Sequence, residues 1–220
     1  MTDASGLARF RHIAVEGVIG AGKSTLARQL AERLGAELLL EQAAENPFLG
    51  RFYADMTGYA FQTQLFFLFQ RQKQLEAIAQ PTMFAASVVS DFMFAKDAIF
   101  ARLTLSDDEY RLYAQMHAPI AAQLPAPDLV IWLQASAPTA LARVRRRGIV
   151  IEHGIDIEYL ERLGSGYARH FASEASAPVF VVDSEAFDLR PGGGQLDRLL
   201  AALAAFEGTR GSLDDRCLFD

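Results

Sequence analysis

Cysteine is almost missing from this chain of 220 residues, which contains one, Cys217. A single cysteine cannot form a disulfide within the chain, and this usage is typical of a reducing compartment. No run is long or apolar enough to span a bilayer, and residues 1–11 lack the apolar core of a signal peptide. We therefore expect a cytoplasmic protein with no membrane partner.

Positive charge is also in short supply, since 21 Lys and Arg face 27 Asp and Glu for a net charge of −6. This balance argues against broad nucleic-acid binding and indicates that any anion is held in a local pocket. Half of the residues (51%) are hydrophobic, enough for a substantial core. We expect one domain over 1–220, with loose ends at 1–8 and 210–220.

A glycine-rich loop is the strongest signal in the chain. Residues 17–25 read Gly-Val-Ile-Gly-Ala-Gly-Lys-Ser-Thr and fit the phosphate-binding pattern G-x-x-x-x-G-K-[ST]. Glycines let backbone N–H groups point at a polyphosphate, and the helix that begins near Lys23 adds its positive dipole end. Lys23 would reach the β and γ phosphates, and Ser24 would hold Mg²⁺. The residues expected at the nucleoside triphosphate are Gly17, Gly20, Ala21, Gly22, Lys23, Ser24 and Thr25.

Short apolar runs alternate with helical patterns along the rest of the chain. This alternation predicts an α/β fold of three layers, in which helices cover both faces of a parallel five-stranded sheet. Ligands of such sheets bind beyond the carboxyl ends of the strands. The expected strands are 13–15, 37–40, 86–90, 129–133 and 179–182, and a long helix is expected over 59–80.

Two carboxylates stand at predicted strand ends. Glu41 follows the second strand, where it could remove the proton of an acceptor hydroxyl or simply be a solvated glutamate. Asp91 follows the third strand and could hold Mg²⁺ or cap the next helix at its N-terminus. Both positions converge on the glycine loop, which favours the functional interpretation.

An arginine cluster at 143–147 is followed by Gly148, which indicates a hinged lid whose arginines neutralise a transferring phosphoryl group. The alternative is a solvated basic helix end, and a nucleic-acid patch fits less well with the acidic chain. Gln62 lies in the long helix among aromatic residues that include Phe66. It could face solvent, or it could bond to a base edge while the rings stack on that base.

Longer stretches of the chain resemble the deoxynucleoside kinase family, specifically its bacterial deoxyadenosine and deoxyguanosine kinase-like members. The stretches that carry the resemblance occur in the family's order over most of the chain, and they include the glycine loop as part of a P-loop kinase fold. They are 13–17 with the loop, Glu41 with 45–49, 52–53, 59–64, 96–101, 127–131 and 147–160.

The resemblance implies transfer of the γ-phosphate of ATP to the 5′-hydroxyl of a deoxynucleoside, with Mg²⁺ held by Ser24 and Asp91. It also implies a homodimer through long helices and a purine as the preferred base. The roles that it implies are Glu41 as the base, Gln62 and Phe66 at the nucleobase, Tyr53 and Glu152 at the sugar 3′-hydroxyl, Lys96 among the substrate-binding residues, and Arg143 and Arg147 in the lid.

The chain departs from the family pattern at three places. The family usually has an arginine directly after the third-strand carboxylate, and this chain has Phe92 after Asp91, so a lid arginine is one expected substitute. A second lid arginine is replaced by Ile149. Some members of the family also have an arginine late in the long helix that helps to read the base, where this chain has Phe69 or Gln70. Base preference therefore rests only on the purine-type members that the chain resembles most.

Two other classes share the glycine loop. A nucleoside monophosphate kinase resembling thymidylate kinase would need arginines to grip an anionic acceptor, but Glu41-Gln42 has no adjacent arginine. A regulatory GTPase would need an Asn-Lys-x-Asp box, and the chain's one asparagine, Asn46, precedes a proline. The sequence therefore favours a neutral hydroxyl acceptor and an enzyme.

Overall fold

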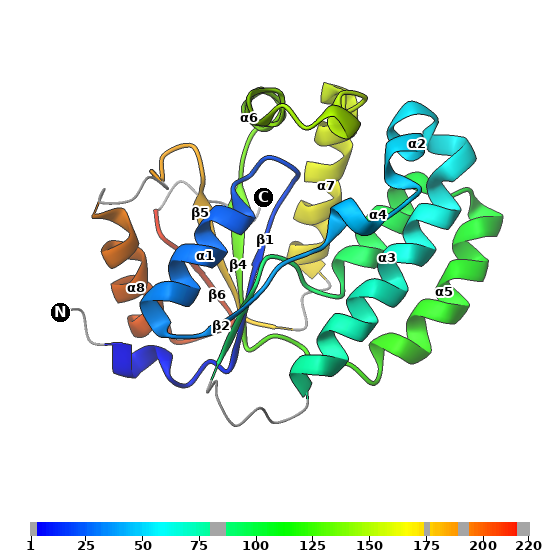
Figure 1. The fold of residues 1–220 in the computed structure, drawn as a ribbon. Helices are drawn as coiled ribbons and strands as arrows, with labels where there is room; N and C mark the ends of the chain where they lie inside the picture. The colour runs from blue at the N-terminus through cyan, green and yellow to red at the C-terminus, as the bar shows by residue number, and fades with distance from the viewer. Residues whose placement is uncertain (1–3, 80–86, 174–176, 189–193, 215–220) are drawn as a thin grey trace.

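The computed structural model describes residues 4–79, 87–173, 177–188 and 194–214. Cys217 and the first residue of the strand expected from 86 lie outside these ranges. The described chain forms a sheet with helices on both faces, as predicted (Figure 1). Within it, no helix is long and apolar enough to cross a membrane.

The sheet has six strands in the order β2-β3-β1-β4-β5-β6, and every neighbouring pair is parallel. The strands with continuous apolar runs, β1 and β4, lie in the middle and are buried along nearly their whole length. The bounds are β1 His12–Glu16, β2 Glu37–Leu39, β3 Val88–Ser90, β4 Leu129–Gln134, β5 Val179–Asp183 and β6 Arg210–Ser212.

The sixth strand corrects the expectation of five strands and of a loose end from residue 210. β6 has no apolar pattern, so the sequence gives no signal for it, and its pairing with β5 is made by the backbone. Gly211 allows the approach, because a Cβ there would lie 2.7 Å from the Phe206 ring. The other expected loose end is also partly wrong, since Ala4–Leu7 forms a 3₁₀ helix, η1, with Leu7 buried.

Helices cover the two faces of the sheet unequally (Figure 1). α1 and α8 lie on one face, while α3, α4, α5 and α7 lie on the other. The bounds are α1 Lys23–Leu34, α2 Leu49–Ala54, α3 Met56–Ala79, α4 Lys96–Thr104, α5 Asp107–Ala121, α6 Ala137–Arg147, α7 Ile157–Ser173 and α8 Gln195–Ala205, with short 3₁₀ helices η2 Ala43–Glu45 and η3 Val150–Glu152.

Several helix ends form as their sequences predict. Ser106 and Glu109 make the capping box of α5, and Asp156 accepts a hydrogen bond from Tyr159 N at the start of α7. Gly35 and Gly148 end α1 and α6 in the left-handed conformation. Because β1, β2 and β3 run parallel, the loops that follow them meet at one edge of the sheet, where α2 and α6 also lie (Figure 1).

Candidate active site

The glycine loop joins β1 to α1 and leaves its backbone open to a ligand. Gly20 and Gly22 have φ of +87° and +103°, which residues with a Cβ rarely adopt. A Cβ on Gly20 would also lie 2.4 Å from the Ala140 carbonyl oxygen, so the loop packs against α6 only because glycine stands there. Lys23 is the first residue of α1, and its Nζ donates to the Gly17 and Val18 carbonyls at 2.9 and 3.0 Å.

Glu16, the last residue of β1, holds the start of the glycine loop in place through hydrogen bonds. Its buried carboxylate accepts hydrogen bonds from Gly17 N at 3.1 Å, Met93 N at 2.8 Å and the Tyr167 hydroxyl at 2.8 Å. These donors come from the first residue of the glycine loop, the segment after β3, and α7. A strand-end carboxylate that the sequence places beside the loop thus positions the loop rather than a substrate.

Ser24 and Asp91 lie side by side. The Ser24 hydroxyl donates to Asp91 Oδ2, while Asp91 Oδ1 accepts from Glu41 N at 2.7 Å. Asp91 therefore does not cap the next helix, since α4 begins at Lys96 and Ala95 is its N-cap residue. A hydroxyl and a carboxylate at the start of α1 fit Mg²⁺, which takes one or two protein oxygens plus phosphate and water.

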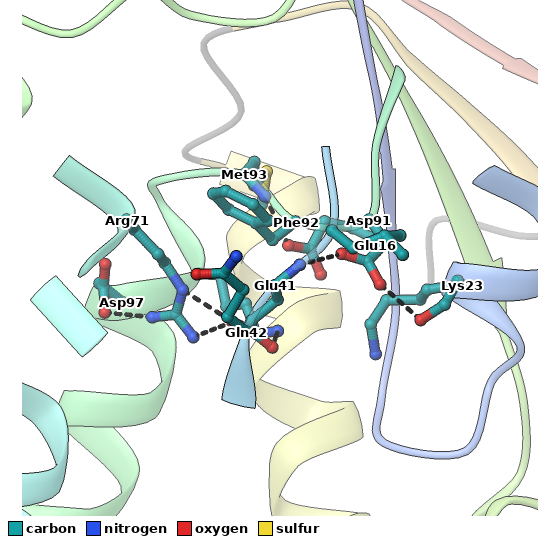
Figure 2. Close-up of polar contacts among 12 residues, drawn as sticks. Glu16, Lys23, Glu41, Gln42, Arg71, Asp91, Phe92, Met93 and Asp97 are labelled. Atoms are coloured by element: carbon teal, nitrogen blue, oxygen red, sulfur yellow. Dashed lines mark hydrogen bonds and ion pairs between the residues drawn. The ribbon is translucent and has the colours of Figure 1, made fainter. Parts of the chain in front are cut away.

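Glu41 is paired with two cations, and Figure 2 shows its contact with Arg71. Arg71 donates from Nε to Glu41 Oε1 at 2.8 Å, and its Nη2 also contacts that oxygen. Lys96 Nζ donates to Glu41 Oε2 at 2.9 Å. Burial alone would raise the pKa of Glu41, but Arg71 and then Lys96 outweigh it and hold the pKa far below its ordinary value. Glu41 is therefore ionised at neutral pH.

Arg71 extends this cluster into the core. Its Nη1 is paired with Asp97, and the side chains of both residues are almost fully buried, at 2% and 0% exposure. Burial raises the pKa of Asp97 to about 6, although Arg71 opposes that shift. The guanidinium in Figure 2 lies between the two carboxylates and so has a counter-ion on each side.

Arg71 is the functional residue that sequence reasoning missed. It belongs to the face of α3 that carries Leu68 and Leu75, three residues before and four after it, both buried. A charged residue in such an apolar stripe is the signal that could have revealed a buried ion pair. Two cations, Arg71 and Lys96, therefore pair with Glu41, while the substitution of a lid arginine for the missing arginine after Asp91 stays a prediction.

The lid arginines have partners of their own. Arg143 donates to Ser184 Oγ at 3.0 Å, to the Ser184 carbonyl at 2.7 Å and to the Ala21 carbonyl at 3.3 Å. Arg147 pairs with Glu152 at 2.6 Å. Arg143 therefore ties α6 to the glycine loop and to the segment after β5.

Tyr53 and Glu152 come together across α2 and η3. Burial raises the pKa of Tyr53 well above its ordinary value, and the nearby charges of Glu152 and Glu41 add to the shift. Gly154 lets the two elements approach, since a Cβ there would lie 2.2 Å from the Tyr53 carbonyl oxygen. The pair expected at the sugar thus lies in the neighbourhood of Glu41.

Gln62 and Phe66 lie on α3, but their surroundings differ. Gln62 is exposed and Phe66 is partly buried. The buried glutamine of this stretch is Gln64, whose Nε2 donates to Thr104 Oγ1 at 3.3 Å. Exposure of Gln62 agrees equally with a solvent-facing amide and with one that faces an open ligand site.

A cleft of about 850 Å³ opens above the glycine loop, within the size range of small-molecule sites. Its lining combines the loop with arginines of α6 and with residues that follow β5. The sequence analysis predicted the loop and the arginines but not the residues after β5. The lining residues are Gly20, Gly22, Lys23, Ser24, Thr25, Arg143, Arg146, Arg147 and 184–188.

Comparison with known proteins agrees with this geometry. The deoxynucleoside kinase family model matches residues 13–205. A deoxyguanosine kinase of Bacillus subtilis is 38% identical over 156 residues, covering 70% of this chain and 75% of that protein. A deoxyadenosine/deoxycytidine kinase of the same organism is 30% identical over 203 residues, covering 88% and 91%.

Solved structures show the same fold. The deoxyadenosine kinase of M. mycoides with bound dATP has a TM-score of 0.77 at 29% identity, covering 87% of this chain and 98% of that one. These matches give no support to the alternative of a nucleoside monophosphate kinase. The chain therefore belongs to the deoxynucleoside kinase family and is an ATP-dependent kinase that phosphorylates deoxynucleosides.

Proposed function

We propose that this kinase transfers the γ-phosphoryl group of ATP to the 5′-hydroxyl of a purine deoxynucleoside, with Glu41 as the base. The observation that carries the proposal is the ionised carboxylate of Glu41, which follows β2. The backbone N–H of Glu41 donates to Asp91 beside the phosphate loop. The preference for a purine rests on the names of the relatives, which include deoxyguanosine and deoxyadenosine kinases.

In the reaction, the 5′-oxygen forms a bond to the γ-phosphorus while the bond from that phosphorus to the β–γ bridging oxygen breaks. The bridging electron pair leaves with the nucleoside diphosphate, and the hydroxyl proton passes to Glu41. Because the pKa of Glu41 is low, the proton moves as the new O–P bond makes the hydroxyl acidic, and not before.

Lys23 and the loop N–H groups hold the triphosphate, together with Gly17, Gly20, Ala21, Gly22, Ser24 and Thr25. Burial lowers the pKa of Lys23 to about 8, and the positive charge of Lys96 adds to the effect. Bound phosphate would reverse the shift, because it supplies opposite charge. Mg²⁺, held by Ser24 and Asp91, would neutralise phosphate charge.

Tyr53 and Glu152 would hold the sugar 3′-hydroxyl, while Gln62 and Phe66 would contact the base. Arg147 is paired with Glu152, so a nucleoside bound to Glu152 would free this arginine for the phosphoryl group. Arg143 would support the loop from the lid side. We further propose a cytoplasmic homodimer that acts in nucleotide salvage.

A phosphorylation screen tests the proposal. The four deoxynucleosides, their ribose counterparts and their 5′-monophosphates are each incubated with ATP and Mg²⁺, and products are separated by chromatography. We expect deoxyguanosine or deoxyadenosine to give the 5′-monophosphate. Phosphorylation of monophosphates alone would rule out a hydroxyl acceptor, and pyrimidine deoxynucleosides as the sole substrates would rule out the purine.

A further inference from the structure

Lys96 is a buried lysine whose ammonium group contacts Glu41 and acts electrostatically on Lys23 of the phosphate loop. It is the first residue of α4 and 3% exposed. In the described part of the chain, its hydrogen bonding is to Glu41 Oε2, at 2.9 Å. Its positive charge also helps to lower the pKa of Lys23, so the two ammonium groups are close enough to repel each other.

The two cations on Glu41 differ in what else holds them. Arg71 is paired with Asp97 as well as with Glu41, so it keeps a buried counter-ion whatever happens to Glu41. Lys96 has its ion pair with Glu41. Neutralising Glu41 would therefore leave Arg71 paired with Asp97, whereas Lys96 would lose the carboxylate with which it forms its ion pair, which is costly for a buried cation.

Glu41 is neutralised in the proposed reaction, on which this inference rests. The acceptor changes from a neutral alcohol to a phosphate monoester with two negative charges, and the leaving diphosphate carries one charge fewer than the triphosphate. The charge gained by the acceptor comes from the transferred group and from Glu41, which takes up the proton. Glu41, the neighbour of Lys96, thus loses its negative charge while a phosphate forms on the acceptor.

We propose that Lys96 changes its counter-ion during the reaction, from the Glu41 carboxylate to the newly formed 5′-phosphate. An ammonium group carries three N–H donors, and Glu41 accepts one, which leaves donors for phosphate oxygens. Before transfer Lys96 keeps Glu41 ionised and in place. After transfer it stabilises the product.

Binding of nucleoside and of its 5′-monophosphate separates this role from a structural one. We measure both affinities by calorimetry, without ATP, in wild type, Lys96→Met and Lys96→Arg. Lys96→Met should weaken monophosphate binding by on the order of 10- to 100-fold, the value of a charge-assisted contact, and change nucleoside binding much less. Lys96→Arg should retain most of the monophosphate affinity.

The chain offers a matched control, because its third lysine, Lys73, is exposed on α3. Lys73→Met should bind both ligands as wild type does. A merely structural lysine would not separate the two affinities in this way.

The inference would be overturned if Lys96→Met lost affinity equally for both ligands, or if it bound the monophosphate as tightly as wild type does. If Lys96→Met does not fold, Lys96→Gln takes its place, because glutamine keeps a donor for Glu41 and removes the charge. Wild-type protein that binds and phosphorylates no nucleoside would instead refute the proposed function. An active wild type with an unaffected Lys96→Met refutes the role of Lys96 alone.

Discussion

Glu41 is the residue whose charge state the chemistry needs, and its neighbours are arranged to keep it ionised. Arg71 and Lys96 bond to different oxygens of the carboxylate. Its side chain is 15% exposed, so a ligand can still reach it. The cluster thus combines a buried arginine, Arg71, with a carboxylate that is partly accessible to a ligand.

Glu41→Gln should lower kcat by on the order of 10²- to 10⁴-fold, because the amide cannot accept the hydroxyl proton. Rate measurements at saturating nucleoside and ATP check this. The fold should persist, although Arg71 and Lys96 lose their anion, and circular dichroism tests that. Unchanged kcat would remove Glu41 as the base.

His12 makes folding stability depend on pH. Its Nε2 bonds to Ser90 Oγ at 2.8 Å, and the ring is buried at the start of β1. Burial lowers the pKa of His12 from 6.5 to about 4, even though nearby Asp128 opposes the shift. Between these values the unfolded chain binds a proton that the folded chain does not.

The contribution of His12 to stability is therefore complete above pH 6.5 and is lost as the pH falls toward 4, by on the order of 3 kcal/mol. Urea unfolding at several pH values should show a shallower loss for His12→Gln than for wild type over this window. His153→Gln, at an exposed position, is the control. Equal slopes for His12→Gln and wild type would contradict the assignment.

At the scale of elements, the glycine loop combines backbone conformation with close packing. Gly20 and Gly35 both have positive φ, but a Cβ on Gly20 would meet the Ala140 carbonyl, whereas nothing lies within 4 Å at Gly35. Substitution of Gly35 by alanine therefore measures the cost of a left-handed conformation alone. The same substitution at Gly20 adds the cost of distorting the loop.

Gly20→Ala should weaken ATP binding by on the order of tenfold or more, because α6 and the loop must move apart. Gly35→Ala should cost about 1 kcal/mol of stability and leave ATP affinity near that of wild type. Calorimetric titration with a non-hydrolysable ATP analogue checks both. Similar ATP affinity in the two variants would show that the loop tolerates the displacement.

At the scale of the whole molecule, α3 is the proposed contact between two copies of the chain. Phe69 on this helix is an aromatic side chain that is 52% exposed, and it would be covered in such a contact. Sedimentation should give twice the chain mass of 24.2 kDa. Phe69→Ser should raise the dimer dissociation constant by on the order of tenfold.

Val150→Ser is the control for the dimer, since Val150 is 75% exposed but lies in η3. It should leave the dissociation constant unchanged. A wild-type monomer at micromolar concentration would refute the dimer, and an equal effect of both variants would place the contact elsewhere.

The sequence alone determined the features that consecutive residues build: the glycine loop with Lys23 at the start of α1, the capping box of α5, and five of the six strands. Local backbone preferences and apolar runs produce these features, so short stretches contain the whole signal. β6 was missed because its pairing depends on a neighbouring strand rather than on its own residues.

Only the tertiary structure decided how the charges around Glu41 are paired. Arg71 lies 30 residues from Glu41 and Lys96 lies 55 residues from it, on helices that meet β2 through the order of the sheet. No local pattern reports which buried cation meets which carboxylate. That choice follows from burial, because a charge withdrawn from water needs a partner nearby, and packing alone determines which one is within reach.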